Sequence, residues 1–308
     1  MYKTAGRGWG RMAGMDLDKV ASFMAGHARL LDRRRFELLM GEGEPAGALA
    51  ALEGYRNADG GYGWGLEPDL RSPESQPGSA LHAFEVFEQA PSPRAAELCD
   101  WLQTVTRPDG GLPFALPLTV AQATAPWWQG ADRSESSLQI TAVTAAAAWR
   151  VAAHDPAVAA HPWLARASAY CLETISSLKE RPHAYVLAFA VRFLDTQPSA
   201  SDLLDRLGEF VPPNGEMHVE GGTEHEMLRP LDFSPAPGLP SRRLFTVEAV
   251  AADLDRLESL QREDGGWTVD YATISPAGAL DWRGAVTVNA LQILRDNGRL
   301  DQALGRGA

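Results

Sequence analysis

The sequence has little cysteine, no long apolar run and no excess of positive charge. Cys99 and Cys171 are the only cysteines among 308 residues, which excludes a disulfide framework or a cysteine zinc cluster and makes a cytoplasmic location the default expectation. The net charge of −12 argues against nucleic acid as a partner, because phosphate backbones attract basic proteins. No apolar run approaches the roughly 18 residues of a spanning helix, so no integral membrane segment is expected.

Strand signals are also nearly absent, whereas apolar residues recur at helical spacing through most of the chain. Hydrophobic residues make up 45% of the sequence, enough for a large core. Residues 1–15 lack the apolar stretch of a signal peptide. We expect a loose N-terminal arm over 1–15 and one domain over 16–308. The expected helices span 16–40, 45–57, 77–90, 92–106, 134–153, 161–178, 181–196, 199–211, 245–262, 284–297 and 299–305.

A glycine turn recurs along the chain. It reads Asp-Gly-Gly at 59–61, 109–111 and 264–266, with a degraded Asn-Gly copy at 214–215. The first glycines of the four copies are separated by 50, 105 and 50 residues. A repeat of roughly fifty residues indicates stacked or closed supersecondary units.

The expected helices pair in sequence order, and the turns mostly follow the second helix of a pair. Six antiparallel pairs closed in a ring give an all-α fold, a single (α/α)6 toroid with an inner and an outer layer. Helix 134–153 is apolar all round and falls in an inner slot, as a buried helix should. The fifth inner slot has no clean helix. The Pro- and Gly-rich segment 212–244 stands there, and we expect it to fold over the cavity as a long loop.

This alternation places the loops before the inner helices at one mouth of the ring. They are long, and loops of that length in a compact domain are usually functional. We therefore expect the site at this mouth, above a central cavity. The loops span 58–76, 107–133, 212–244 and 263–283.

The segment Leu260–Trp267 resembles the QW motif of squalene–hopene cyclases. The wider pattern, over about 16–305, resembles the terpenoid cyclase and protein prenyltransferase toroid superfamily. The resemblance implies that Gln261 caps a helix end and that Trp267 stacks on it, tying outer helices together. Gln103 matches in an earlier copy, where Leu112 replaces the tryptophan.

The resemblance implies an isoprenoid or other hydrophobic substrate in an aromatic-lined cavity, with carbocation cyclisation or rearrangement. It implies no cofactor, except Mg²⁺ if the substrate is a diphosphate. The acidic motif of class II cyclases, Asp-x-Asp-Asp, is absent: Asp281 fits its first position, but Arg283 stands where the acid should be. The Asp-Asp pair of class I enzymes is absent from the whole chain.

The densest group of candidate residues lies in the mouth loop 61–71. Glu67 and Asp69 are candidate acids or bases, with Tyr62 and Trp64 as substrate-binding aromatics. The alternative is that either carboxylate pairs with Arg71 or caps the next helix.

Two further carboxylates are candidate catalytic residues, Glu135 and Asp281. Glu135 opens the most buried expected helix, where burial would raise its pKa for acid chemistry while the helix dipole opposes that shift. The alternative is simple capping by Ser134 and Glu135. Gln139, further along that helix, either lines the cavity or satisfies backbone carbonyls.

The remaining substrate-binding candidates are aromatic, imidazole and guanidinium groups. Adjacent indoles in a loop form either a hydrophobic lid or a plug, and His82 either faces the cavity or is a satisfied core histidine. Paired arginines suit a diphosphate or carboxylate, or neighbouring acids. These candidates are Trp127, Trp128, Trp282, His82, Arg242 and Arg243.

No metal site is expected, since the His218–Glu226 segment lacks the spacing of a helical histidine pair. Two other functions remain open beside the cyclase-like one. A carbohydrate-active enzyme would need paired carboxylates and aromatic platforms. A non-catalytic toroid would bind a lipid or protein. The sequence does not decide whether the chain is an enzyme, nor its oligomeric state.

Overall fold

The fold is all-α, as the periodicity predicts. The computed structural model describes residues 11–12 and 15–300, and within them regular structure is almost wholly helical. Two short antiparallel ribbons complete it. One pairs β1 (Arg11–Met12) with β2 (Met15–Asp16), and the other pairs β3 (Met217–His218) with β4 (Met227–Leu228).

The helices of the first half start mostly at prolines or capping side chains. Ser137, for example, caps the long buried helix α7 by accepting from the Ile140 N–H. The bounds are α1 (Leu17–His27), α2 (Leu30–Leu39), α3 (Pro45–Glu53), α4 (Pro77–Gln89), α5 (Arg94–Val105), α6 (Pro126–Gln129) and α7 (Leu138–Ala152).

The second half follows the same rules. Thr246 and Ser275 cap the last two helices, and proline occupies the first turn of several others. The bounds are α8 (Pro156–Ala159), α9 (Pro162–Ser177), α10 (Ala184–Leu194), η1 (Pro198–Ala200), α11 (Ser201–Gly208), α12 (Pro230–Phe233), η2 (Pro240–Leu244), α13 (Val247–Ser259) and α14 (Pro276–Asp296).

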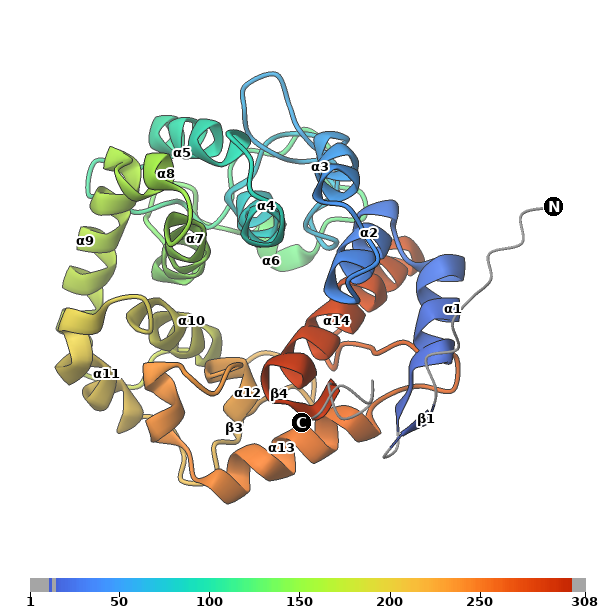
Figure 1. Ribbon diagram of the computed structural model, residues 1–308. Helices are drawn as coiled ribbons and strands as arrows, with labels where there is room; N and C mark the ends of the chain where they lie inside the picture. Colours follow the sequence, from blue (N-terminus) through green and yellow to red (C-terminus); the bar gives the residue numbers. More distant parts are fainter. Residues whose placement is uncertain (1–10, 13–14, 301–308) are drawn as a thin grey trace.

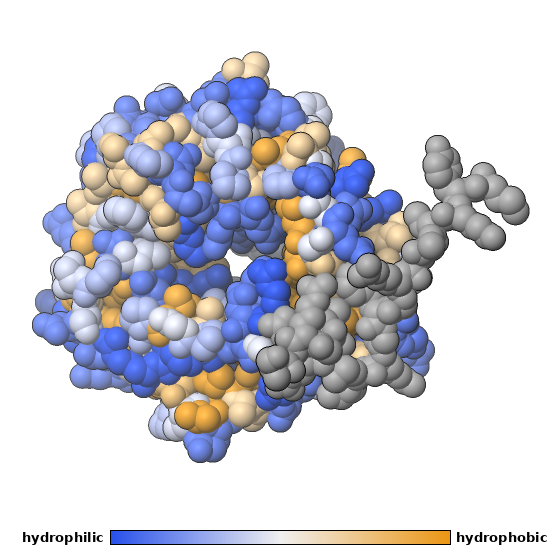
Figure 2. All heavy atoms as spheres, in the orientation of Figure 1, coloured by the Kyte–Doolittle hydropathy of each residue, from blue (hydrophilic) through white to orange (hydrophobic). Residues whose placement is uncertain are grey.

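The helices follow one another around a centre in Figure 1. Helices α2, α4, α7, α10 and α14 lie nearer the centre, and α1, α3, α5, α9, α11 and α13 lie outside them. The buried helix α7 packs between α4 and α10 and against α9. Figure 2 shows an opening at the centre of the face in view, surrounded by hydrophilic residues.

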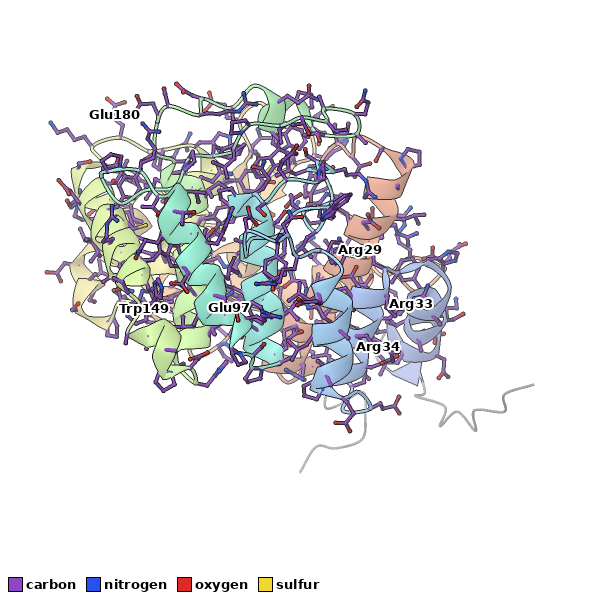
Figure 3. All side chains as sticks on the ribbon, turned by 90° about the horizontal axis from the view of Figure 1, so that it is seen from above. Arg29, Arg33, Arg34, Glu97, Trp149 and Glu180 are labelled. Carbon is purple, nitrogen blue, oxygen red and sulfur yellow. The ribbon has the colours of Figure 1, made fainter. Side chains whose placement is uncertain are left out.

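The long connections gather at one end of the helices. In Figure 3 the loop that contains α6 runs across that end, and Glu180, in the turn before α10, lies there too. No helix within the described ranges is both long enough and apolar enough to cross a membrane.

Two expected helices differ most from those observed. The single helix expected over 16–40 is two helices, because the backbone turns extended at Ala28 and Arg29. The helix expected from 284 begins at Pro276, where Ser275 accepts from the Gly278 N–H. The partner expected at 299–305 lies almost entirely outside the described residues. Among the described helices, α14 packs against α1, α2 and α13.

The expected long loop 212–244 carries more structure than proposed. It holds β3, β4, the short helix α12 and η2. Helix α12 packs against α10 and α13, which is the position expected of the missing inner helix.

The repeated glycine turns share one geometry. Gly60, Gly110 and Gly265 have φ of 93°, 97° and 98°, a region that favours glycine. A Cβ at Gly265 would lie 2.2 Å from the carbonyl carbon of Lys19. The aspartate before each glycine pair accepts a hydrogen bond from the N–H of the second glycine. The turns are therefore structural.

The best QW-like copy joins the first helix, α1, to the segment that follows α13. Gln261 Oε1 accepts from the Asp16 N–H at 2.8 Å, and Gln261 Nε2 donates to the Asp16 carbonyl at 3.0 Å. Asp16 is the N-cap of α1, and Gln261 follows the end of α13. Trp267 is buried and its indole N–H donates to Leu257 O. The motif thus ties α13 to α1 across 245 residues.

Candidate functional site

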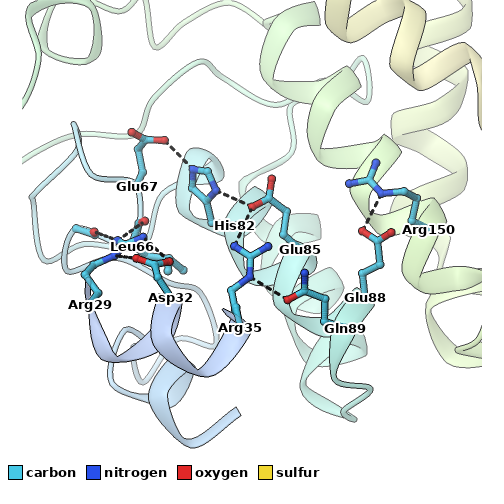
Figure 4. Close-up of polar contacts among 11 residues, drawn as sticks. Arg29, Asp32, Arg35, Leu66, Glu67, His82, Glu85, Glu88, Gln89 and Arg150 are labelled. Atoms are coloured by element: carbon cyan, nitrogen blue, oxygen red, sulfur yellow. Dashed lines mark hydrogen bonds and ion pairs between the residues drawn. The ribbon is translucent and has the colours of Figure 1, made fainter. Parts of the chain in front are cut away.

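The mouth loop after α3 is held by an arginine at the break between α1 and α2. Arg29 Nη1 donates to the carbonyls of Gly65 and Leu66, both at 3.1 Å. Its Nε forms an ion pair with buried Asp32 at 2.8 Å. Figure 4 shows this anchor beside the loop. The chain turns at residues 28–29, and this turn brings Arg29 to the loop. Its contacts with the loop therefore favour the break between α1 and α2 over one continuous helix.

Asp69 is the most perturbed carboxyl in this loop. Its side chain is 2% exposed, and Oδ2 accepts a hydrogen bond from Trp282 Nε1 at 2.7 Å. Oδ1 is buried and has no partner with good geometry among the described residues. Burial raises the pKa of Asp69 to about 6; Trp282 and the Ile274 backbone oppose this shift and Glu67 adds to it. Asp69 can therefore hold a proton near neutral pH.

Glu67 and Glu85 hold His82 between them. His82 Nε2 lies 2.8 Å from Glu67 Oε2, and Nδ1 lies 3.0 Å from Glu85 Oε2. Burial alone would lower the pKa of His82, but Glu85 and Glu67 outweigh it and raise the pKa to about 10. His82 is therefore an imidazolium at neutral pH. Figure 4 shows the three side chains linked in the order Glu67, His82, Glu85, from the loop to α4.

The line of charges continues along the inner helices. Arg35 of α2 lies 3.8 Å from Glu85 and donates to Gln89, and Arg150 of α7 pairs with Glu88 at 2.8 Å. Burial would raise the pKa of Glu85, but His82, Arg35 and Arg150 lower it to about 2. These ion pairs link α2, α4 and α7 and form a charged belt on the inner helices, where the resemblance implies an aromatic-lined cavity.

Aromatic rings stand beside the carboxyl group of Asp69. The Trp282 ring centroid lies 5.5 Å from that of Tyr271 and 6.0 Å from that of His82, both edge-on. The ring centroids of Tyr185 and Phe189, both on α10, lie 5.8 Å apart. Burial raises the pKa of Tyr271 well above its usual range, and the charges of Glu67 and Asp69 add to the effect. Trp282 thus lies against Asp69, and Tyr271 lies against Trp282.

Asp281 lies on α14, not in a loop before it. It forms an ion pair with Arg71. The alternative that Arg71 pairs with Glu67 or Asp69 is therefore wrong, because Arg71 is taken by a residue 210 positions away. This pair ties the mouth loop to α14 beside Asp69.

Glu135 does not have the environment expected of it. Helix α7 begins at Leu138 with Ser137 as its cap, so neither Ser134 nor Glu135 caps it. Glu135 is exposed, so the burial expected of it is absent. Gln139 is partly exposed on the first turn of α7. The neighbouring Thr141 hydroxyl accepts from Leu112 N and donates to Ser137 O.

The two aromatic side chains expected to bind substrate from the mouth loop lie in different environments. Tyr62 is 1% exposed and packs edge-on against Phe87 in the core. Trp64 is 58% exposed, and its indole donates to Asn57 Oδ1.

The paired indoles of α6 also differ from each other. Trp128 is buried and stacks on Phe114 at 4.6 Å, which fits the plug alternative. Trp127 is 43% exposed.

The paired arginines lie away from this site. Arg243 pairs with Asp205 at 2.9 Å and bonds Ser201, and Arg242 bonds Asn297 at 3.2 Å. Arg243 therefore has the neighbouring acid of the alternative. Within the described residues, no group of three or more His, Cys, Asp or Glu is arranged to hold a metal ion.

Sequence reasoning missed several members of the site. Arg29, Arg35, Glu85 and Tyr271 were not selected. Glu85 carried a signal, since it lies three residues after His82 on α4 and shares its face. The other three come from distant segments.

No protein-family model matches this chain, and no curated protein is significantly similar to it.

Proposed function

We propose that the chain is an acid–base enzyme of the (α/α)6-toroid class, acting on a polar substrate of carbohydrate type. The observation that carries the proposal is the buried carboxyl of Asp69, whose pKa is raised to about 6 and which is bonded to Trp282. A general acid works best when its pKa lies near the working pH.

Two carboxyl groups with different surroundings supply the two roles. Asp69 donates its proton to the leaving oxygen as the carbon–oxygen bond breaks. Glu67, in an ion pair with the His82 imidazolium, is the neighbouring carboxylate that accepts a proton from the attacking water. Neighbouring titratable groups held in different environments are the usual arrangement for acid and base. Trp282 and Tyr271 supply an aromatic face for a sugar ring.

The charged belt favours a polar substrate over the isoprenoid that the QW resemblance implies. Glu85, Arg35 and Arg150 lie on the inner helices, and an apolar chain packed against them would strip water from their charges at a high cost. Alkene protonation also needs a stronger acid than a carboxyl with a pKa near 6.

The isoprenoid function remains the second candidate because Trp282 and Tyr271 lie beside the acid. Aromatic faces stabilise cations. In that case a diphosphate substrate would call for Mg²⁺. A toroid that binds its ligand without catalysis is the outcome if Asp69 proves unnecessary.

The test is turnover of a panel of neutral and acidic oligosaccharides, followed as new reducing ends. Prenyl diphosphates with Mg²⁺ and squalene-type polyprenes form a parallel arm, read by mass spectrometry. We expect oligosaccharide turnover that falls at least about a hundredfold in Asp69→Asn. Glu135→Gln, at an exposed carboxylate, is the matched control and should keep full activity. Turnover unaffected by Asp69→Asn, or confined to the isoprenoid arm, would reject the proposal.

A further inference from the structure

Helix α10 lies near the centre of the molecule in Figure 1 and has one partly exposed face. Tyr185, Phe189 and Arg192 follow one another at helical spacing and are all partly exposed. The residues between them on the other faces, such as Leu187, Val191 and Phe193, are buried. Arg192 therefore extends the face that Tyr185 and Phe189 begin.

The charges that act on Arg192 come from several inner elements. They are Arg150 of α7, Glu85 and Glu88 of α4, and Asp232 of α12. Helix α10, which carries Arg192, packs against α7 and α12, and α7 packs against α4. These helices lie near the centre of the molecule in Figure 1, where Figure 2 shows an opening whose visible border is hydrophilic.

Arg192 differs from the other cations of the belt. His82 and Arg35 share Glu85, and Arg150 pairs with Glu88. Arg192 forms no ion pair and no hydrogen bond with any residue in the described part of the chain. It carries five N–H donors and no acceptor. Burial and the nearby charge of Arg150 both lower the pKa of Arg192, so its charge is held in unfavourable surroundings.

We propose that Arg192, with Arg150 as a second cation, binds an anionic group of the ligand in the central opening. The group is a carboxylate or a phosphate, because the planar guanidinium fork matches both. It would relieve the repulsion between the two arginines. The inference deepens the proposed function and rests on it: the carbohydrate carries an acidic substituent, held on α10 while Asp69 acts near the mouth loop.

Direct binding tests this without turnover. Calorimetric titration uses Asp69→Asn protein, which should bind without consuming the ligand. The probes are glucuronate-terminated and neutral oligosaccharides of equal length, a sugar phosphate, and inorganic phosphate. We expect the acidic sugars to bind about tenfold or more tightly than the neutral one, with preference for carboxylate or phosphate identifying the group.

Arg192→Met on this background should remove that preference, a loss of roughly tenfold to hundredfold for the acidic ligand alone. Arg192→Lys should retain part of it. Arg181→Met, at an exposed arginine in the turn before α10, is the matched control and should bind as the parent does. Circular dichroism of each variant checks folding.

Equal affinity for acidic and neutral ligands in the parent, or an acidic preference that survives Arg192→Met, overturns the inference. Failure of the proposed function would give a different result: turnover would not depend on Asp69. An Arg192-dependent preference with no such turnover leaves an anion-binding toroid, and Asp69-dependent turnover of neutral sugars alone leaves an enzyme without this subsite.

Discussion

The indole N–H of Trp282 donates to Asp69 Oδ2 at 2.7 Å, joining α14 to the mouth loop across 213 residues. The bond stabilises the ionised form of a carboxyl that burial would otherwise keep protonated. Trp282 therefore sets how strong an acid Asp69 is, besides presenting a ring beside it.

Replacing Trp282 by phenylalanine should move the pH dependence of Asp69 upward. The variant keeps an aromatic ring but loses the donor that lowers the pKa of Asp69. A lost hydrogen bond to a charged group corresponds to about one pKa unit. The titration of Asp69 can be followed by carbon NMR of the carboxyl group, and activity that requires the protonated acid should extend to higher pH. An unchanged or lowered pKa contradicts the role given to the bond.

The free energy of unfolding of Asp69→Asn, minus that of the parent protein at the same pH, should be larger at pH 7.5 than at pH 4.5. The folded-state pKa of Asp69, about 6, exceeds its unfolded value. The parent therefore loses stability as pH rises between about 4 and 6, by about 3 kcal/mol. Urea unfolding of both proteins at the two pH values measures the difference. A difference that does not change with pH would show that Asp69 titrates normally.

The imidazolium of His82 contributes to the free energy of unfolding, and the parent protein loses this contribution in alkaline solution. His82→Gln should lack the contribution at every pH. The folded-state pKa of His82 is raised to about 10. Its contribution is therefore fully present below about pH 6.5 and is lost as pH rises toward 10. We expect the parent to be the more stable protein at pH 6 by a few kcal/mol and the gap to narrow by pH 10. The check is the denaturation midpoint across that range, and a constant gap would contradict it.

Gln261→Ala should destabilise the fold by about 3 kcal/mol and leave activity unchanged. The side chain makes two hydrogen bonds to the Asp16 backbone and one to Gly265 O, each worth about 1 kcal/mol. Gln103→Ala is the matched control, because Gln103 is exposed at the equivalent place in an earlier repeat. It should change the free energy of unfolding by less than about 0.5 kcal/mol. Equal losses in both variants would argue against the tie between α13 and α1.

Local patterns determined much of this fold. The 3.6-residue periodicity gave the helices, because a helix buries one stripe of side chains whatever its partner. The Asp-Gly-Gly turns were visible because only glycine adopts φ near +95° readily. The boundary at Arg29 was missed, since its cause is a contact with the carbonyls of Gly65 and Leu66.

The sequence by itself determined an all-α chain with a repeated turn, and marked Glu67, Asp69 and His82 as residues able to carry charge or protons. Only the tertiary structure decided which of them do what. Asp69 gains its raised pKa from burial under α14, and His82 its charge from Glu67 and Glu85. Glu135 loses its expected role because α7 begins three residues later. A pKa depends on the solvent and charges within a few ångströms, and those neighbours come from segments up to 213 residues apart.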